Sequence, residues 1–168
     1  MKSKILCGID GRDHTARALT AAVELAKKLD AELTLYMANP ACLPGRGPIF
    51  YLWRDDCVEK TLNEAAFRAR WSGLAHVRCE TERTLDIADA IVAYADRQEA
   101  DYIILNASER SELIKLISGS VTRGVTVKAN CPVLIVKRTR EQQRDDLDRG
   151  LPVRDFSHNQ SRLGQARA

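Results

Sequence analysis

The sequence has few aromatic residues, and it lacks the patterns of a disulfide framework, a metal cluster and a membrane span. Aromatic residues make up 5% of its 168 residues, so the core must be aliphatic. The five cysteines form no Cys-x-x-Cys pair, and only three histidines are present to join them at a metal. We therefore expect reduced thiols, no metal site and a cytoplasmic protein. No apolar run approaches the length that crosses a bilayer, so we expect no direct membrane insertion.

Charge of one sign is not concentrated anywhere, and the familiar catalytic motifs are missing. The 26 basic and 23 acidic residues are well mixed and give a net charge of +3. A nucleic-acid-binding protein usually carries a basic stripe with interleaved aromatic residues, so we expect no nucleic-acid partner. There is no Gly-x-Ser-x-Gly, no His-Glu-x-x-His and no Walker-type lysine loop. We therefore expect no catalytic residues and no enzymatic activity.

What the sequence does contain is an alternation of short apolar runs with segments of helical spacing. The runs predict strands at 5–9, 32–38, 76–82, 102–105 and 132–137, and the spacing predicts helices near 16–29, 54–71, 86–98 and 120–129. Residues 39–48 contain three prolines and two glycines and are predicted to form a loop. This order predicts an α/β fold, with a five-stranded parallel sheet flanked by helices on both faces.

The composition changes near residue 139. Glutamine, arginine and aspartate dominate from there to the end, and apolar residues are sparse. We therefore predict an α/β domain over residues 1–138 and a polar, disordered tail over residues 139–168.

Two loops of the predicted sheet are candidates for a ligand site, because ligands of such sheets bind beyond the carboxyl ends of the strands. Asp10 and Gly11 follow the first strand, and residues 106–111 follow the fourth. Gly119 and Ser120 open the last helix, where backbone N–H groups can hold an anion. Ordinary helix capping is the alternative explanation for Asp10 and for Ser120, and both interpretations stay open.

The sequence resembles the universal stress protein family over about residues 4–138. The resemblance is carried by residues 5–11, 100–105 and 119–121, and above all by residues 130–136, where a helix runs into Cys-Pro-Val and a buried strand. It implies a Rossmann-like domain with five parallel strands, and usually a homodimer. It also implies that the last strand lies at the sheet edge, where unpaired backbone favours pairing across a two-fold axis. The predicted dimer interface is therefore Val133, Leu134, Ile135 and Val136.

ATP-binding members of that family carry a glycine, two residues, a second glycine, nine residues, and then glycine followed by serine or threonine. Alignment on Gly119 and Ser120 puts Asn106 and Glu109 at the first two glycine positions. A side chain there occupies space that the phosphates need. A carboxylate about 5 Å from one phosphate charge costs about 3 kcal/mol at an effective dielectric of about 20, or roughly a hundredfold in affinity. We therefore expect no cofactor, with ATP binding weak at most.

Two functions from different classes follow from the resemblance. The first is a small dimeric regulatory or interaction protein that lacks tight ATP binding and acts through a protein partner. The alternative is an ATP-binding switch or slow ATPase that uses Asp10, Gly119 and Ser120, with Arg110 or a magnesium ion offsetting Glu109. A small-anion sensor that uses the same helix start is a third possibility.

Overall fold

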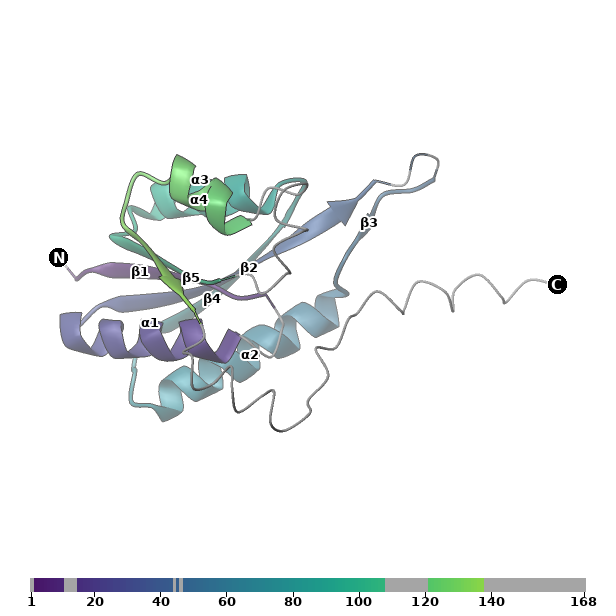
Figure 1. Cartoon of the computed structure of the whole chain (residues 1–168). Helices are drawn as coiled ribbons and strands as arrows, with labels where there is room; N and C mark the ends of the chain where they lie inside the picture. Colours follow the sequence, from purple (N-terminus) through teal and green to yellow (C-terminus); the bar gives the residue numbers. More distant parts are fainter. Residues whose placement is uncertain (1, 11–14, 44, 46, 108–120, 138–168) are drawn as a thin grey trace, which may run out of the picture. The chain divides into compact units, whose positions relative to one another are not determined.

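The structure is a computed structural model that describes residues 2–10, 15–43, 45, 47–107 and 121–137 (Figure 1). The predicted tail lies outside these residues. In chain order the elements are β1 (Lys4–Gly8), α1 (Thr15–Leu29), β2 (Glu32–Cys42), β3 (Phe50–Tyr51), α2 (Asp55–Trp71), β4 (Val77–Thr84), α3 (Ile87–Gln98), β5 (Tyr102–Asn106), α4 (Val121–Lys128) and β6 (Val133–Val136).

Five parallel strands form the sheet in the order β4-β2-β1-β5-β6. The central strand is β1, in which Ile5 lies between Leu33 of β2 and Tyr102 of β5. The five-stranded parallel sheet expected from the sequence is therefore confirmed. The last strand in this order, β6, pairs with β5 alone among the described strands, so β6 is an edge strand.

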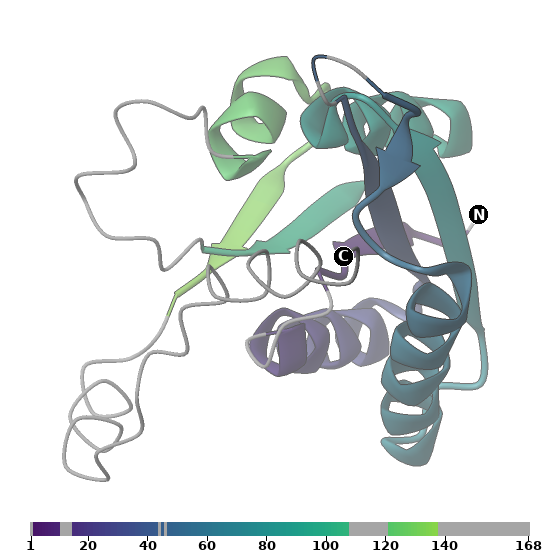
Figure 2. The same cartoon turned by 90° about the vertical axis from the view of Figure 1, so that its right-hand side faces the viewer.

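Helices cover the sheet on both faces, with α1 and α2 on one side and α3 and α4 on the other (Figures 1 and 2). Successive side chains of a strand point to opposite faces, so each strand supplies both layers. In β1, Ile5 and Cys7 pack with α1 and α2, whereas Leu6 packs with α3 and α4. The core is aliphatic as predicted, with fully buried Leu33, Leu35, Ile103 and Ile104 at its centre.

The local sequence explains where α2 and α3 begin. Asp86 precedes α3 in an extended conformation, and its carboxylate accepts the Asp89 N–H at 2.9 Å, which is a side-chain N-cap. No side-chain cap precedes α2, but Asp55 and Asp56 lie in its first turn, where negative charge suits the helix dipole.

The prediction of a loop over residues 39–48 was wrong at its start. The strand β2 continues to Cys42, and β3 returns antiparallel to it, with Tyr51 opposite Ala41. Pro40 is tolerated inside the strand because only its carbonyl is needed: it accepts the Leu52 N–H at 2.9 Å. The result is a short hairpin beyond the parallel part of the sheet (Figure 1).

The helices α3 and α4 approach each other closely at one position. A Cβ on Gly124 of α4 would lie 2.7 Å from the Cβ of Ala88 in α3. Glycine is therefore required there by packing rather than by backbone conformation. Among the described residues, no helix is long and apolar enough to cross a membrane.

Candidate ligand site at the carboxyl ends of β1 and β5

The two loops that the sequence selected begin side by side, because β1 and β5 are neighbours in the sheet. Asp10 follows β1 and is exposed, and Asn106 ends β5 and is half-buried. The other predicted site residues, Gly11, Glu109, Gly119 and Ser120, lie outside the described residues. The structure thus brings the ends of both strands together, and the remaining site assignments stay predictions.

Asn106 links the end of β5 to the first turn of α1. Its Oδ1 accepts the Ala18 N–H at 3.1 Å, while its carbonyl accepts the Thr122 hydroxyl of α4 at 3.4 Å. The amino end of a helix carries the positive end of its dipole, where an anion is favoured. The amide oxygen of Asn106 therefore occupies a place at the start of α1 that suits a negatively charged ligand atom.

The other half of the Asn106 amide is not satisfied in the same way. Its Nδ2 is buried and has no hydrogen-bond partner in the described part of the chain. A buried donor without a partner is costly. The sequence alone marked this residue only as a missing glycine. The signal for its contact was its residue type, because asparagine at the end of a strand often bonds to nearby backbone.

Strand β1 stays hydrogen-bonded to β2 up to the residue before Asp10. The Ile9 N–H donates to the Tyr36 carbonyl at 2.8 Å, one residue past the end of β1, and Asp10 comes next. Burial raises the pKa of the Cys7 thiol to about 12, and the charge of Asp10 adds to this effect. Cys7 therefore stays a thiol at neutral pH and fills the core rather than reacting.

A second asparagine, which the sequence did not single out, fixes the connection from β2 to α2. Asn39 is 1% exposed. Its Nδ2 donates to the Trp53 carbonyl at 2.8 Å, and its Oδ1 accepts the Trp53 N–H at 3.0 Å. Both halves of the amide are thus satisfied by one backbone residue. The segment that enters α2 is held in place just beyond the carboxyl half of β2.

Packing also fixes where α4 starts. The Ala107 N–H donates to the Val136 carbonyl at 2.8 Å, so the β5–β6 ladder reaches the first residue after β5. The close contact at Gly124 sets α4 against α3. Val121, the first residue of α4, comes directly after Gly119 and Ser120 in the sequence.

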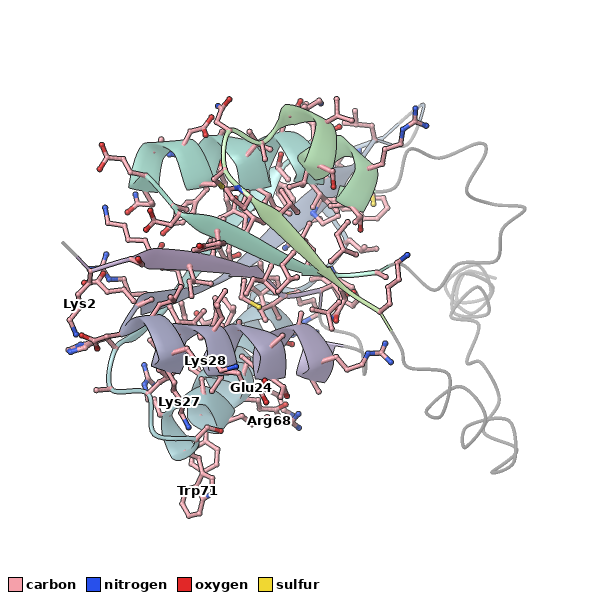
Figure 3. The ribbon with its side chains drawn as sticks, turned by 60° about the vertical axis from the view of Figure 1, so that its left-hand side comes forward. Lys2, Glu24, Lys27, Lys28, Arg68 and Trp71 are labelled. Carbon is pink, nitrogen blue, oxygen red and sulfur yellow. The ribbon has the colours of Figure 1, made fainter. Side chains whose placement is uncertain are left out.

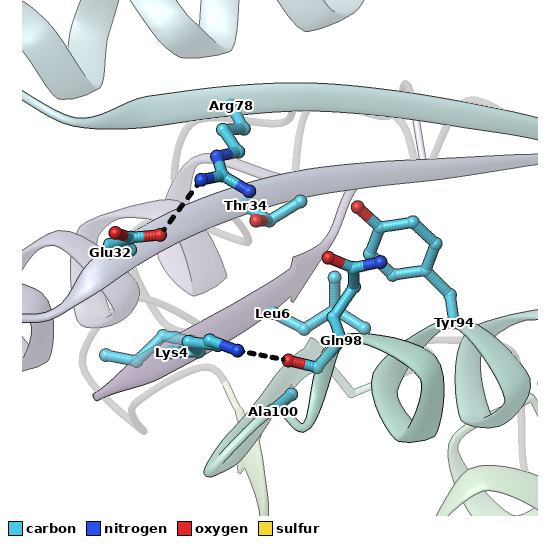
Figure 4. Close-up of a pocket in the computed structure, with 9 residues that line it drawn as sticks. Lys4, Leu6, Glu32, Thr34, Arg78, Tyr94, Gln98 and Ala100 are labelled. Atoms are coloured by element: carbon cyan, nitrogen blue, oxygen red, sulfur yellow. Dashed lines mark hydrogen bonds and ion pairs between the residues drawn. The ribbon is translucent and has the colours of Figure 1, made fainter. Parts of the chain in front are cut away.

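A small cavity elsewhere in the sheet has too little room for a nucleotide. It lies at the amino ends of the strands and has a volume of about 20 Å³. Two interactions border it (Figure 4): Lys4 Nζ donates to the Gln98 carbonyl at 2.9 Å, and Glu32 pairs with Arg78 at 3.3 Å. That volume suits about one water molecule. Within the described residues no group of three or more His, Cys, Asp or Glu side chains is arranged to bind a metal, and all five cysteines are free thiols.

Comparison with known proteins agrees with this fold. A sequence profile of the universal stress protein family matches residues 1–137. The universal stress protein MJ0531 of Methanocaldococcus jannaschii is 29% identical over 147 residues, covering 83% of this chain and 84% of the relative. A crystal structure of a universal stress protein in complex with cAMP is 25% identical, with a TM-score of 0.66, and covers 82% of this chain and 98% of that one.

A second solved structure, the universal stress protein from Archaeoglobus fulgidus in complex with dAMP, is 26% identical. It superimposes with a TM-score of 0.61 and covers 82% of this chain and all of that one. These similarities confirm the resemblance drawn from residues 5–11 and 130–136. The chain belongs to the universal stress protein family.

Proposed function

We propose that this universal stress protein is a dimeric regulatory protein that acts through a protein partner and does not bind ATP tightly. The observation that carries the proposal is the Asn106 side chain, which bonds to the first turn of α1 at the 3.1 Å contact with Ala18. The family alignment puts a glycine at this position in ATP-binding members. Here a side chain takes the space, and Glu109 adds a negative charge three residues later.

Calorimetry with ATP and magnesium tests the proposal on the full chain after bound nucleotide has been stripped. We expect no saturable heat from the wild type below millimolar ATP. The double variant Asn106→Gly/Glu109→Gly restores both glycines and removes the repulsion, so we expect its affinity to rise by about a hundredfold or more.

The matched control adds Gly119→Asp to the double variant, which puts a carboxylate at the retained glycine and should abolish the gain. Micromolar binding of ATP by the wild type, or nucleotide found by mass spectrometry in the protein as isolated, would overturn the proposal and favour the nucleotide switch.

A second candidate function is a switch that responds to a nucleotide of lower charge. Two similar structures contain cAMP and dAMP, and Asp10 is retained at the end of β1. A cyclic phosphodiester carries less negative charge than a phosphate monoester, and ATP carries more than either. Repulsion by Glu109 therefore weakens ATP most and cAMP least, at about 3 kcal/mol per charge at about 5 Å.

Titration of the wild type with cAMP, dAMP and ATP in parallel tests this second function. Affinity that decreases in that order, with a smaller spread in Glu109→Gln, would favour it over the first. The absence of detectable binding for all three nucleotides would exclude this second function and leave the first proposal in place.

The dimer in this proposal forms through β6. This strand is at the edge of the sheet, and Leu134 is 44% exposed there, whereas Val133, Ile135 and Val136 are half-buried. An apolar edge strand invites pairing with a second copy of itself, which buries its free backbone groups.

Light scattering after size exclusion tests the dimer. Leu134→Lys places a charge in the proposed interface and should yield monomer or precipitate. The control Leu29→Lys changes a residue of similar exposure, 40%, at the end of α1 and should leave the mass unchanged. An unaltered dimer in Leu134→Lys would move the interface away from β6.

A further inference from the structure

The outer face of α2 carries two large aromatic side chains that are mostly exposed. Phe67 is 64% exposed and Trp71 is 83% exposed, in a chain whose aromatic content is 5%. They lie one helical turn apart, and their rings stack with centroids 6.0 Å apart and an interplanar angle of 27°. The opposite face of α2 packs in the core through five buried residues, Val58, Leu62, Ala65, Ala66 and Ala69.

Beside the stacked rings lies an open hollow. Its volume is about 310 Å³, and its walls are Phe67, Arg68, Trp71 and Ser72. This is enough room for a large apolar side chain of another molecule, with Trp71 as one wall. Trp71 extends away from the end of α2 into solvent (Figure 3).

One cationic side chain, Arg68, forms part of the wall of this hollow, and the last turn of α1 brings two lysines to the same side of the molecule. Lys27 and Lys28 come from the last turn of α1, and Arg68 comes from the last turn of α2 (Figure 3). A Cβ built on Gly73 would lie 3.8 Å from Nζ of Lys27, so the Lys27 ammonium reaches the end of α2.

None of these three cations makes an ion pair with another described residue, whereas Lys60 on the same helix is paired with Glu64 at 4.0 Å. One carboxylate, that of Glu24 in α1, lies among them (Figure 3). The surface formed by Lys27, Lys28, Phe67, Arg68, Trp71 and Ser72, called here the Trp71 patch, therefore carries an excess of positive charge.

Helix stability explains only part of this arrangement. Cations near the carboxyl end of a helix suit its dipole, and an apolar pair one turn apart adds slightly to the stability of a helix. Neither effect requires a tryptophan that is 83% exposed next to a hollow. Tryptophan and arginine are the residues that most often dominate protein–protein binding energy. A single-stranded nucleic acid needs a longer basic groove with successive stacking rings, and here one side of the Trp71 ring is already covered by Phe67.

We propose that the Trp71 patch is the docking surface for an acidic segment of a partner protein. An apolar side chain of that segment enters the hollow beside Trp71, and carboxylates on either side of it pair with Lys27, Lys28 and Arg68. This inference rests on the part of the proposed function that gives the protein a protein partner. It does not depend on the state of the nucleotide site.

The test uses the full chain and short synthetic peptides of defined sequence. Each acidic peptide carries one apolar residue, varied among leucine, isoleucine, methionine and phenylalanine, flanked by aspartates and glutamates. The matched peptides carry asparagine and glutamine in place of the acids. Fluorescence anisotropy of the labelled peptides should show saturable binding of at least one acidic peptide, weaker at higher salt, and none of its amide counterpart.

Variants then locate the binding. Trp71→Ala should reduce the affinity by about tenfold or more, as expected for a central aromatic anchor. Lys28→Glu should reduce it several-fold, whereas the matched charge reversal Lys60→Glu on the outer face of α2 should not. Because these side chains are exposed, circular dichroism should show an unchanged fold for all of them.

Three results would overturn the inference. One is the absence of binding to every acidic peptide, and another is binding that Trp71→Ala and Lys28→Glu leave unchanged. The third is Trp71-dependent binding of a single-stranded oligonucleotide or of anionic lipid vesicles in place of the peptides. Tight ATP binding in calorimetry would overturn the proposed function instead, and it would leave the peptide measurement unaffected.

Discussion

Two asparagines at the carboxyl side of the sheet are used in opposite ways. Asn39 in β2 is buried and has both halves of its amide bonded to the Trp53 backbone. Asn106 in β5 has its oxygen bonded to Ala18, while its buried nitrogen has no partner among the described residues. The first is a complete structural contact. The second is an incomplete one, and it lies at the candidate ligand site.

This difference indicates that Asn39 stabilises the fold, whereas Asn106 belongs to the candidate site at the same edge of the sheet. A fully bonded buried amide stabilises a single arrangement of the chain, because every alternative leaves polar groups unpaired. A half-bonded amide adds little stability and can be replaced by a ligand atom or by glycine. We therefore expect substitutions at the end of β2 to cost much more stability than substitutions at the end of β5.

The largest effect is expected from Asn39→Ala. It leaves the Trp53 N–H and carbonyl without their partners, and we expect the free energy of unfolding to fall by about 2–3 kcal/mol. Urea denaturation followed by circular dichroism measures it. The control Asn130→Ala removes an exposed asparagine bonded to Asp96 and should cost well under 1 kcal/mol. Equal losses in the two variants would contradict the structural role of Asn39.

The next effect is a pH dependence from Cys7, which lies in β1 between Leu35 of β2 and Ile104 of β5. Its pKa rises from 9.0 to about 12 on folding. Between these values the unfolded chain loses a proton that the folded protein keeps, so the free energy of unfolding falls as the pH rises above 9. We expect a loss of about 2 kcal/mol between pH 8 and pH 10.5, at about 1.4 kcal/mol per unit.

Denaturation of the wild type and of Cys7→Ala across this pH range measures the dependence. The variant should have a shallower slope, and the raised pKa values of Tyr36, Cys79, Tyr94 and Cys131 account for the part that remains. Because β1 pairs with both strands, the slope should be the same in the Asn39 and Asn106 variants. A slope that differs between the two variants would contradict the comparison of Asn39 with Asn106. It would show that one of the two asparagines affects the titration of Cys7 in β1.

A smaller effect is expected from Gly124→Ala, which tests the packing that sets α4 beside Asn106. The added methyl group would lie 2.7 Å from the Cβ of Ala88. Overpacking should outweigh the better helix propensity of alanine and lower the free energy of unfolding by about 1–2 kcal/mol. The double variant Ala88→Gly/Gly124→Ala moves the methyl group to the other helix, and it should recover part of the loss in a double-mutant cycle. Additive losses would show that the contact is not tight.

The smallest effect is expected from Asn106→Ala. It loses the bond to Ala18 but also removes the buried nitrogen that has no partner, and these two changes largely cancel. We expect the free energy of unfolding to change by less than about 1 kcal/mol. A loss as large as that of Asn39→Ala would mean that the two asparagines are both scaffold residues.

The parallel sheet and its helices could be predicted because they depend on local patterns. Runs such as residues 102–105 are long enough to show a buried strand, and the five core residues of α2 repeat at helical spacing. The hairpin at the end of β2 was missed because β3 has two residues, which show no period, and because Pro40 argued against a strand.

The side-chain contacts at the site could not be predicted, for a different reason. Asn106 and Ala18 are 88 positions apart in the sequence, and Asn39 and Trp53 are 14 apart. No periodicity connects such pairs, and only the packing of β1, β2 and β5 brings them together. The exposure of Phe67 and Trp71 could not be predicted either. The helical spacing of apolar residues shows which side chains of α2 face the core, and it gives no information on large side chains that face away from it.

The position of β1 in the sheet has a consequence for folding during synthesis. Its partner β2 is the next strand in the chain, but Tyr102, which pairs with Ile5 from the other side, is made roughly 70 residues after Leu33. At about 5–20 residues per second, a ribosome needs about 3–14 s for that interval. Throughout it the first strand exposes one complete edge, and correct folding requires that this edge pair with no other strand before β5 of the same chain emerges.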